Sequence, residues 1–329
     1  MIVVTGGAGF IGSALIWGLN RRGIDDILVV DHLGTGDKWA NLVPLRYREY
    51  LDRDDFITRL ERDAFGETVT AILHMGACSS TTEADAGYLM ENNYRYTARI
   101  AAWWERHRAC RLVYASSAAT YGDGSKGYSD DHGKMCGLRP LNMYGYSKHL
   151  FDLCALRRGW LDGIAGLKYF NVYGPNEYHK GEMRSVINKA YPLMRDEGRI
   201  CLFKSHRDDY ADGEQRRDFL YVKDAVAMTL FFIDNPSVNG IFNIGSGTDR
   251  TWNDVARALS VAMDRETRIE YVPMPERIRD RYQYYTCADM AKLRAAGCSH
   301  RCMDLETGIR DYVRNYLSKG ARLDPNDAE

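Results

Sequence analysis

The chain has 329 residues, with 44 Lys and Arg against 45 Asp and Glu, and a formal net charge of −1 at pH 7. This length suits one large domain or two closely packed ones. The balanced charge argues against nucleic acid as a partner. No apolar run reaches membrane-spanning length and a strand begins at Ile2, so we expect neither a membrane segment nor a signal peptide. Eight cysteines without zinc-ribbon spacing suit a reducing, cytoplasmic location.

Strand-like and helix-like segments alternate through the first part of the chain. The predicted strands are Ile2–Thr5, Ile27–Asp31, Val69–His74, Leu112–Ala115 and Gly166–Tyr169. The predicted helices are Ser13–Arg22, Asp54–Asp63, Glu83–Arg108 and Tyr144–Arg158. Short apolar strands that alternate with helices are typical of a parallel sheet covered on both faces. The pattern therefore predicts an α/β fold with a doubly wound parallel sheet of the Rossmann type.

After Asn171 the alternation becomes less regular, which predicts a second, smaller α/β lobe. Phe219–Val222, a helix from Asp224 and Ile241–Ile244 are expected to return to the sheet domain. We therefore assign 1–172, 219–246 and about 286–318 to the sheet domain, and 173–218 with 247–285 to a substrate-binding lobe. The cleft between the lobes is the expected substrate site. The charged segment Lys204–Arg216 is predicted to be a solvated loop, with a place over the cleft as the alternative, and 319–329 a disordered tail.

A glycine-rich turn follows the first strand. Gly7, Gly9 and Gly12 form G-x-G-x-x-G between that strand and a helix. In this context the glycines permit a tight turn, close approach of a pyrophosphate and close packing of the helix on the strand. The second strand ends at Asp31, where a carboxylate would meet the adenosine ribose of a dinucleotide. The segment therefore predicts a dinucleotide site.

Tyr144 and Lys148 are four residues apart on a predicted helix. Residues at i and i+4 share one face of a helix. An ammonium beside a phenol favours the phenolate, so we expect Lys148 to lower the pKa of Tyr144. Such a tyrosine can exchange protons with an alcohol while a cofactor exchanges the hydride. The pair therefore predicts an enzyme that carries out redox chemistry on an alcohol.

Cys298, His300 and Cys302 are close together in the sequence. The rest of a four-ligand site is not apparent around them, so we predict a surface loop and no metal.

Four motifs occur in order along the chain: Gly7-x-Gly9-x-x-Gly12, Ser116-Ser117, Tyr144-x-x-x-Lys148 and Asn171-Val172-Tyr173-Gly174-Pro175. With them the chain resembles the extended short-chain dehydrogenase/reductases over nearly its whole length. This family contains nucleotide-sugar epimerases and dehydratases. Residues 74–83, 114–122 and 169–181 most resemble the members that act on ADP-glyceromanno-heptose, and 281–283 and 293–297 extend the likeness.

The resemblance implies a reaction: C6 of the heptose in ADP-D-glycero-β-D-manno-heptose is oxidised to a ketone and reduced on its other face. Ser117 would hold the reacting oxygen, while Tyr144 and Lys180 would exchange protons. Lys148 would bind the nicotinamide ribose. The implied substrate contacts are Ser117, Asn171, Val172, Phe203, Arg217 and Tyr282. The implied cofactor contacts are Gly7, Gly9, Phe10, Ile11, Gly12, Asp31, His32, Lys38, Arg53, Met75, Gly76, Ala77, Cys78, Ser79, Asn92 and Lys148. A homo-oligomer, a pentamer, and a role in making the lipopolysaccharide core are also implied.

The adenosine end of the cofactor site contains charges of both signs. Asp31 alone favours NAD, because a carboxylate repels a 2′-phosphate. Lys38 and Arg53 supply opposing positive charge and accompany NADP preference in the resembling family, so we expect NADP, with NAD as the alternative. Glu182 and Lys189 depart from the family pattern beside Lys180 and are expected to contact the substrate and to affect its choice.

Three other functions compete with this one. A 4,6-dehydratase would need acidic residues where this chain has Ala118 and Ala119, because a departing hydroxyl needs a proton donor. A UDP-hexose 4-epimerase would use the same Ser117, Tyr144 and Lys148 but lacks the heptose-like segments. A non-catalytic dinucleotide sensor would share the fold, since fold alone does not settle function.

Overall fold

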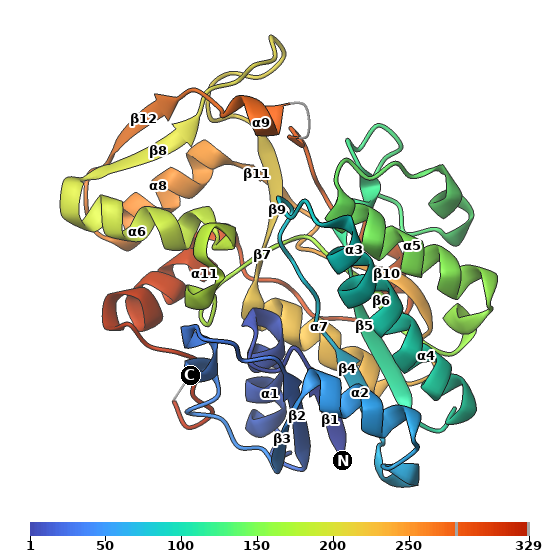
Figure 1. The fold of residues 1–329 in the computed structure, drawn as a ribbon. Coiled ribbons are helices and arrows are strands. Elements are labelled where there is room, and N and C mark those ends of the chain that lie inside the picture. The colour runs from blue at the N-terminus through green and yellow to red at the C-terminus, as the bar shows by residue number, and fades with distance from the viewer. Residues whose placement is uncertain (280–281, 328–329) are drawn as a thin grey trace.

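The structure is a computed structural model, and it describes residues 1–279 and 282–327; Arg281, in one of the resembling segments, lies outside the described residues. Its main element is a seven-stranded parallel sheet (Figure 1). The strands are β1 (Ile2–Thr5), β2 (Ile27–Asp31), β3 (Glu49–Asp52), β4 (Ala71–His74), β5 (Arg111–Ser117), β6 (Ala165–Tyr169) and β10 (Gly240–Ile244). Their order is β10-β6-β5-β4-β1-β2-β3, so the winding reverses between β1 and β4. Ligands bind at such a reversal, beyond the carboxyl ends of the strands.

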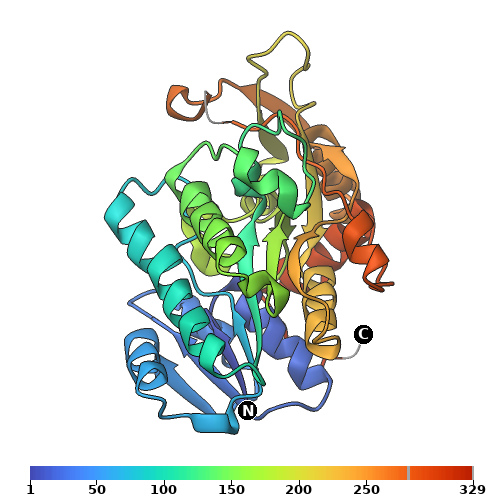
Figure 2. The ribbon, with the colours of Figure 1, turned by 90° about the vertical axis from the view of Figure 1, so that its right-hand side faces the viewer.

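Helices cover both faces of this sheet, as Figure 2 shows. The elements on one face are α1 (Phe10–Arg21) and α7 (Val222–Asp234); on the other they are α2 (Arg53–Glu61), α4 (Tyr96–Arg106) and α5 (Met143–Arg157). Val4 and Val29 belong to the core on the α1 side, whereas Val3, Leu28 and Val30 belong to the core on the other side. This alternation follows from the two-residue period of a strand. The predicted doubly wound fold is confirmed.

The helix that was predicted over Glu83–Arg108 is shorter and irregular. It begins with α3 (Ala86–Leu89), passes through a π-helical turn (Met90–Arg95) and continues as α4. A π-helical turn inserts an extra residue into the helix and often occurs at functional sites. Here it places Asn92 among the residues that line the cleft described below.

The second lobe combines two small sheets with helices. The sheets contain β7 (Asn171–Tyr173), β9 (Arg216–Tyr221) and β11 (Asp249–Thr251) in one, and β8 (Arg199–Phe203) with β12 (Arg268–Val272) in the other. The helices are α6 (Val186–Glu197), α8 (Trp252–Ala262) and α9 (Glu276–Arg279). Phe219–Val222, which was expected to return to the sheet domain, lies mostly in β9, and β9 pairs with β7 and β11 rather than with the seven-stranded sheet.

The C-terminal part contains α10 (Ala291–Ala295) and α11 (Leu305–Asp311), which continues through a π-helical turn over Tyr312–Tyr316. α11 packs against α8, so it lies against the second lobe rather than only against the sheet domain.

The expected disordered tail is instead packed, as far as Asp327. The Leu323 side chain is fully buried and its N–H donates to Asn176 Oδ1 over 3.0 Å. Trp17 Nε1 donates to the Asp324 carbonyl over 3.2 Å. These long-range contacts are not visible in the polar local sequence, and residues 328–329 lie outside the described part. Among the described residues, no helix has the length and apolar character to cross a bilayer.

Candidate active site

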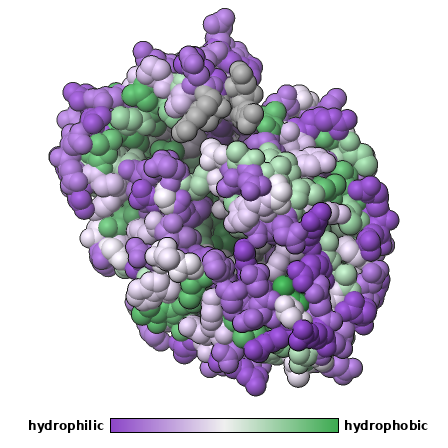
Figure 3. Space-filling view, in the orientation of Figure 1, coloured by the Kyte–Doolittle hydropathy of each residue, from purple (hydrophilic) through white to green (hydrophobic). Residues whose placement is uncertain are grey.

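A cleft of about 740 Å³ lies at the carboxyl ends of β1, β2, β4 and β5, and α6 and α8 close its other side. Figure 3 shows the molecule hollowed near the centre of this face, with apolar residues at the floor. Most of the predicted site residues line it: Gly9, Phe10, Ile11, Gly12, Asp31, His32, Lys38, Arg53, Met75, Gly76, Ala77, Cys78, Ser79, Asn92, Ser117, Tyr144, Lys148, Asn171, Val172 and Lys180. Residues that are 171 positions apart in the chain therefore contribute to one cavity.

The glycine turn forms the wall of the cleft beside α1. A Cβ added at Gly12 would lie 2.0 Å from the Gly6 carbonyl oxygen, and one at Gly9 would lie 3.0 Å from the same atom. Gly6 has a positive φ of 65°, which favours glycine. Gly7 does not line the cleft, because a Cβ there would point at Val29 on β2. The turn thus exposes bare backbone at a helix N-terminus, which suits a pyrophosphate.

Charged and polar groups gather at the end of β2, where the adenosine of a dinucleotide would lie. Asp31 accepts hydrogen bonds from the N–H groups of Ala8 (2.9 Å) and His32 (2.7 Å). Lys38 Nζ lies 2.7 Å from Asp31 Oδ1, so the carboxylate is paired within the protein. Arg53 completes the positive side of this group.

Two polar atoms in the same place have unused hydrogen-bonding capacity. Arg53 Nη1 donates to Asn92 Oδ1 over 2.7 Å, while Arg53 Nε and Asn92 Nδ2 are buried without a hydrogen-bond partner among the described residues. Arg53 Nε lies 3.6 Å from Asp54 Oδ1, an ion pair that is too long for a hydrogen bond. Buried donors are seldom left unpaired. These two therefore fit a bound group that supplies acceptor oxygens, as a dinucleotide does.

The loop after β4 lies between the glycine turn and α5. Asn93, fully buried in the π-helical turn, brackets Cys78: its Oδ1 accepts from the Cys78 N–H (2.9 Å) and its Nδ2 donates to the Cys78 carbonyl (3.0 Å). Asn93 Nδ2 also lies 3.0 Å from Ser147 Oγ on α5. The sequence reasoning included Asn92 but missed Asn93, whose role depends on the irregular helix.

Ser117, Tyr144 and Lys148 meet at the centre of the cleft. Ser117 ends β5, and Tyr144 and Lys148 lie on one face of α5, which begins at its N-cap Asn142. A hydrogen bond from Ser117 lowers the pKa of Tyr144, but burial raises it more, so the net pKa is raised. The expected lowering by Lys148 is therefore wrong for the protein alone. The Lys148 ammonium donates to the Ala115 carbonyl over 2.7 Å, and burial lowers its pKa to about 8.

Lys180 also lines the cleft, next to the start of α1. Its ammonium is 5.1 Å from the centre of the Phe10 ring, within the range of a cation–π interaction. Burial lowers the pKa of Lys180, while the charge of Glu177 opposes this. A buried amine with a lowered pKa is suited to proton exchange near neutral pH.

The remaining predicted substrate residues lie outside the lining of the cleft. Arg217 is buried on β9 between aromatic rings, with its guanidinium 4.8 Å from the Tyr282 ring and 5.8 Å from the Trp252 ring. Trp252 lines the cleft and its Nε1 donates to Tyr282 Oη over 2.9 Å, so this group adjoins the cavity. Phe203 lies 6.4 Å from Tyr282, ring centre to ring centre. The sequence reasoning missed Trp252.

Glu182 and Lys189 contact each other rather than the cavity. Lys189 Nζ donates to the Glu182 carbonyl over 3.1 Å. The segment Lys204–Arg216 extends from β8 to β9 at the top of Figure 1, on the side of the lobe away from the main sheet. It is held by its own contacts, such as the Ser205 N–H to Asp212 Oδ1 (2.7 Å).

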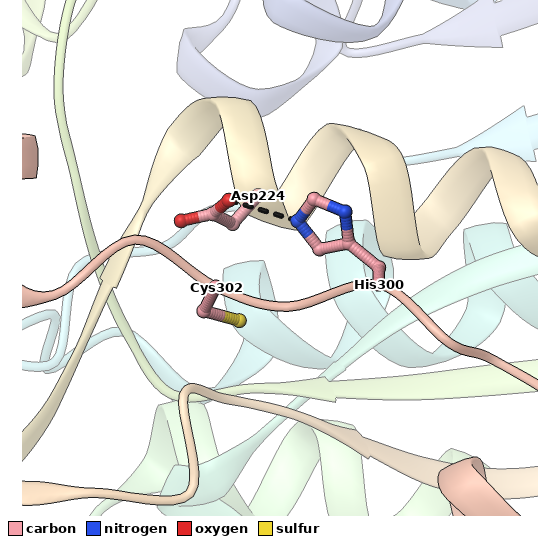
Figure 4. A group of neighbouring side chains, drawn as sticks. All are labelled: Asp224, His300 and Cys302. Carbon is pink, nitrogen blue, oxygen red and sulfur yellow. Dashed lines mark hydrogen bonds and ion pairs between the residues drawn. The ribbon is translucent and has the colours of Figure 1, made fainter.

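The Cys298–Cys302 segment contributes to a different cluster, shown in Figure 4. His300 and Cys302 lie with Asp224 of α7, and their ligand-type atoms are within 4.8 Å of one another. His300 Nε2 lies 2.8 Å from Asp224 Oδ1, and the Met303 N–H donates to Asp224 Oδ2 over 3.0 Å. Burial raises the pKa of the Cys302 thiol to about 12. Both carboxylate oxygens of Asp224 thus contact the C-terminal segment and hold it against α7.

The comparisons with known proteins agree with this geometry. Residues 2–245 match the NAD dependent epimerase/dehydratase family. The ADP-L-glycero-D-manno-heptose-6-epimerase of Nitratidesulfovibrio vulgaris strain Hildenborough is 57% identical over 99% of this chain and 100% of its own. The enzyme of that name from Alkalilimnicola ehrlichii is 48% identical over 95% of this chain and 96% of its own.

Solved structures show the same architecture. The Helicobacter pylori ADP-L-glycero-D-manno-heptose-6-epimerase matches with a TM-score of 0.79 at 25% identity, over 95% of both chains. The Thermus thermophilus UDP-glucose 4-epimerase in complex with NAD matches with a TM-score of 0.77 at 26% identity, over 97% of this chain and 99% of that one. This chain therefore belongs to the NAD dependent epimerase/dehydratase family, and within it to the group of the ADP-L-glycero-D-manno-heptose-6-epimerases.

Proposed function

We propose that the protein inverts C6 of the heptose in ADP-D-glycero-β-D-manno-heptose to give ADP-L-glycero-β-D-manno-heptose, through a 6-keto intermediate. Two relatives that carry the name of this activity cover nearly the whole chain. The observation that carries the proposal is that one cleft is lined by the glycine turn, Ser117, Tyr144, Lys148 and Lys180.

The route through a ketone follows from the chemistry of the substrate. The hydrogen on C6 is not acidic, so simple deprotonation cannot invert that carbon. A bound nicotinamide supplies the needed chemistry by accepting a hydride from C6 and returning it. The residues of the cleft must then hold the ketone while it turns, and they must move protons on and off its oxygen. Enclosure in the cleft also limits the access of water to the ketone.

Two groups that line the cleft exchange the protons. Tyr144 would take the hydroxyl proton as its phenolate in one orientation of the sugar; the hydrogen bond from Ser117 and the positive charges of Lys148 and of an oxidised nicotinamide would favour that form against the effect of burial. Lys148 holds the nicotinamide ribose and provides positive charge beside α5. Lys180, buried beside Phe10, returns the proton in the other orientation. Asn171 and Val172 line the same cleft.

The nucleotide end of the substrate requires cationic and aromatic groups. Arg217 is buried, and its Nη1 donates to the Arg216 carbonyl over 2.8 Å. The other N–H groups of the guanidinium can donate to a diphosphate. Trp252, Tyr282 and Phe203 surround it with rings on which an adenine base can stack. We therefore place the ADP moiety here, while Glu182 and Lys189 would act on substrate choice from a greater distance.

NADP is the proposed cofactor. The pairing of Asp31 with Lys38 removes most of the repulsion that a 2′-phosphate would meet, and Arg53 adds a second cation whose Nε makes no hydrogen bond to the described residues. Denaturing the purified protein and identifying the released nucleotide by mass spectrometry tests this assignment. Replacing Lys38 with Gln should shift the ratio of the Kd values toward NAD by about 10-fold, because a charged contact to phosphate contributes about 1.5–3 kcal/mol.

The decisive experiment is incubation with ADP-D-glycero-β-D-manno-heptose, followed by NMR to observe inversion at C6. UDP-glucose serves as the parallel substrate, because a UDP-hexose 4-epimerase would turn it over. Turnover of UDP-glucose alone would refute the heptose assignment, and tight cofactor binding without any turnover would favour the sensor alternative. We place the reaction in the cytoplasm, where the eight free thiols are stable, and expect a homo-oligomer, which size-exclusion chromatography with light scattering tests.

A further inference from the structure

A fully buried charged network lies directly behind the catalytic residues. Asp152 on α5 has no exposed surface, and neither has Lys168 on β6. Asp152 Oδ1 accepts from Tyr114 Oη over 2.9 Å, and its Oδ2 accepts from Ser116 Oγ over 2.7 Å. Lys168 Nζ lies 3.4 Å from Asp152 Oδ2. The network has no access to solvent, so it is not a ligand site.

The network connects the two elements that carry the catalytic groups. Lys148 and Asp152 are one helical turn apart on α5, on the face that meets β5. Lys148 Nζ donates to the carbonyl of Ala115, and Asp152 holds the side chains of the residues on either side, Tyr114 and Ser116. Asp152 therefore fixes the position of α5 along β5 at the point where Lys148 is held.

Lys168 extends the network to Ser117. Its Nζ donates to Thr120 Oγ1 over 2.7 Å, and Thr120 Oγ1 donates to the Ser117 carbonyl over 2.8 Å. A buried ion pair usually adds little net stability, because desolvation offsets the attraction. The Asp152–Lys168 pair contacts both α5 and β5, which indicates a role in positioning these elements rather than in adding stability.

The charges in this region are unevenly matched. The ionisable groups that face Lys148 are His74, Cys78 and Asp152, with Tyr144 one turn earlier on α5. Those that face Asp152 are Tyr114, Tyr121, His132, Lys148, His149 and Lys168. His74 is neutral, because burial lowers its pKa to about 3. Asp152 is the one carboxylate whose charge acts on Lys148, whereas Lys168 faces Asp130 as well.

We infer that Asp152 is a positioning residue for the reaction: it docks the catalytic helix on β5 and keeps the buried ammonium of Lys148 charged. Nothing in the comparisons assigns a role to this residue. The inference rests on the proposed roles of Tyr144 and Lys148. Since Asp152 contacts neither substrate nor cofactor, it acts only through Lys148 and the seating of α5.

The inference predicts a change in the pH dependence of kcat. Burial lowers the pKa of Lys148 to about 8, and the charge of Asp152 opposes this lowering. Without the carboxylate, the amine loses its proton at lower pH. An opposite charge at short range shifts a pKa by about one unit or more. Without Asp152, the alkaline limb of the plot of kcat against pH should therefore move to lower pH by about one unit. At pH 9 this lowers the charged fraction of Lys148, and hence kcat, by about 10-fold.

The experiment measures kcat between about pH 6 and pH 9.5, with the bound cofactor quantified in each preparation. Asp152→Asn should move the alkaline limb to lower pH. Lys168→Met, which frees the carboxylate from its second cation, should leave the limb in place or move it to higher pH. Should Asp152→Asn fold poorly, the double variant with Lys168→Met removes both charges, and its limb should also move to lower pH. Unchanged limbs in both Asp152 variants would overturn the inference.

Two further variants separate this result from other causes. Asp224→Asn removes a buried carboxylate that is also ion-paired, to His300, on a helix outside the catalytic group (Figure 4). It controls for loss of stability and should leave the limb unchanged. Lys148→Met should abolish the limb; if it does not, the proposed role of Lys148 fails. If Lys148→Met abolishes the limb while Asp152→Asn keeps it, only the present inference fails.

Discussion

The two halves of the cleft are constructed differently. On the dinucleotide side, backbone groups predominate: the glycine turn and the 75–79 loop are consecutive residues at the ends of neighbouring strands. On the sugar-nucleotide side, single side chains converge from separate elements, with Arg217 on β9, Trp252 on α8 and Lys180 in the turn before α6. In the first half an added side chain can therefore block the backbone contacts, whereas in the second half the removal of a single side chain takes away a contact.

Tyr144 lies where the two halves meet, and its replacement should have the largest effect. Tyr144→Phe removes the hydroxyl that exchanges the proton but keeps the ring, so kcat should fall by about 10²–10⁴-fold. Steady-state kinetics by NMR or chromatography would measure this. Tyr146→Phe is the matched control, because Tyr146 is on the same helix but 46% exposed, and it should retain activity. Near-normal turnover in Tyr144→Phe would remove this residue from the mechanism.

The backbone half should be most sensitive at Gly12. A Cβ there would lie 2.0 Å from the Gly6 carbonyl oxygen, so Gly12→Ala must displace the turn. Ordinary overpacking costs about 1–3 kcal/mol, and this closer contact should weaken cofactor binding by more than about 100-fold. Fluorescence titration with the reduced cofactor measures the change.

Gly137→Ala is the control for this variant, since a Cβ at Gly137 meets nothing within 4 Å and its φ is not positive. Equal cofactor affinity in Gly12→Ala and the parent protein would show that the turn does not carry the pyrophosphate.

The same difference explains what the sequence could predict. The glycine turn, β1, β2 and Asp31 are local in the chain, and their spacing predicted both the strands and the turn. β3 was not predicted, because Glu49–Asp52 is a polar edge strand with an exposed or half-buried pattern. Trp252 was missed because a tryptophan at the start of a helix carries no local sign that it faces a distant cavity.

Long-range pairing accounts for the remaining errors. Phe219–Val222 has the apolar character of a core strand, yet β9 joins β7 and β11 because of partners that local patterns do not reveal. The tail has a polar sequence but is anchored through Leu323, which is completely buried in the hydrophobic core. The pKa of Tyr144 was predicted in the wrong direction, since spacing indicates a neighbouring charge but not the extent of burial.

The side-chain half should respond most at Arg217. Arg217→Met keeps much of the aliphatic volume and removes the guanidinium, so the KM for the ADP-sugar should rise by about 10- to 100-fold with a smaller change in kcat. Lys189→Met is the comparison, because Lys189 contacts the Glu182 carbonyl and does not line the cleft. It should change KM far less. If the KM rises equally in both variants, the nucleotide binds nearer to α6 than we propose.

The segment Lys204–Arg216 should matter least, although it adjoins the same lobe. Arg207 pairs with Asp209 at 2.5 Å and lies 5.1 Å from the ring of Tyr284, so its contacts are within the loop and its base. Exposed ion pairs of this kind contribute little, and Arg207→Ala should leave kcat/KM within about twofold of the parent value. Kinetics at low and high substrate concentration would detect a larger effect on either parameter. A loss of more than about 10-fold in kcat/KM, about 1.4 kcal/mol, would mean that the loop folds over the substrate, and the side-chain half would then include a moving part that the fixed backbone half lacks.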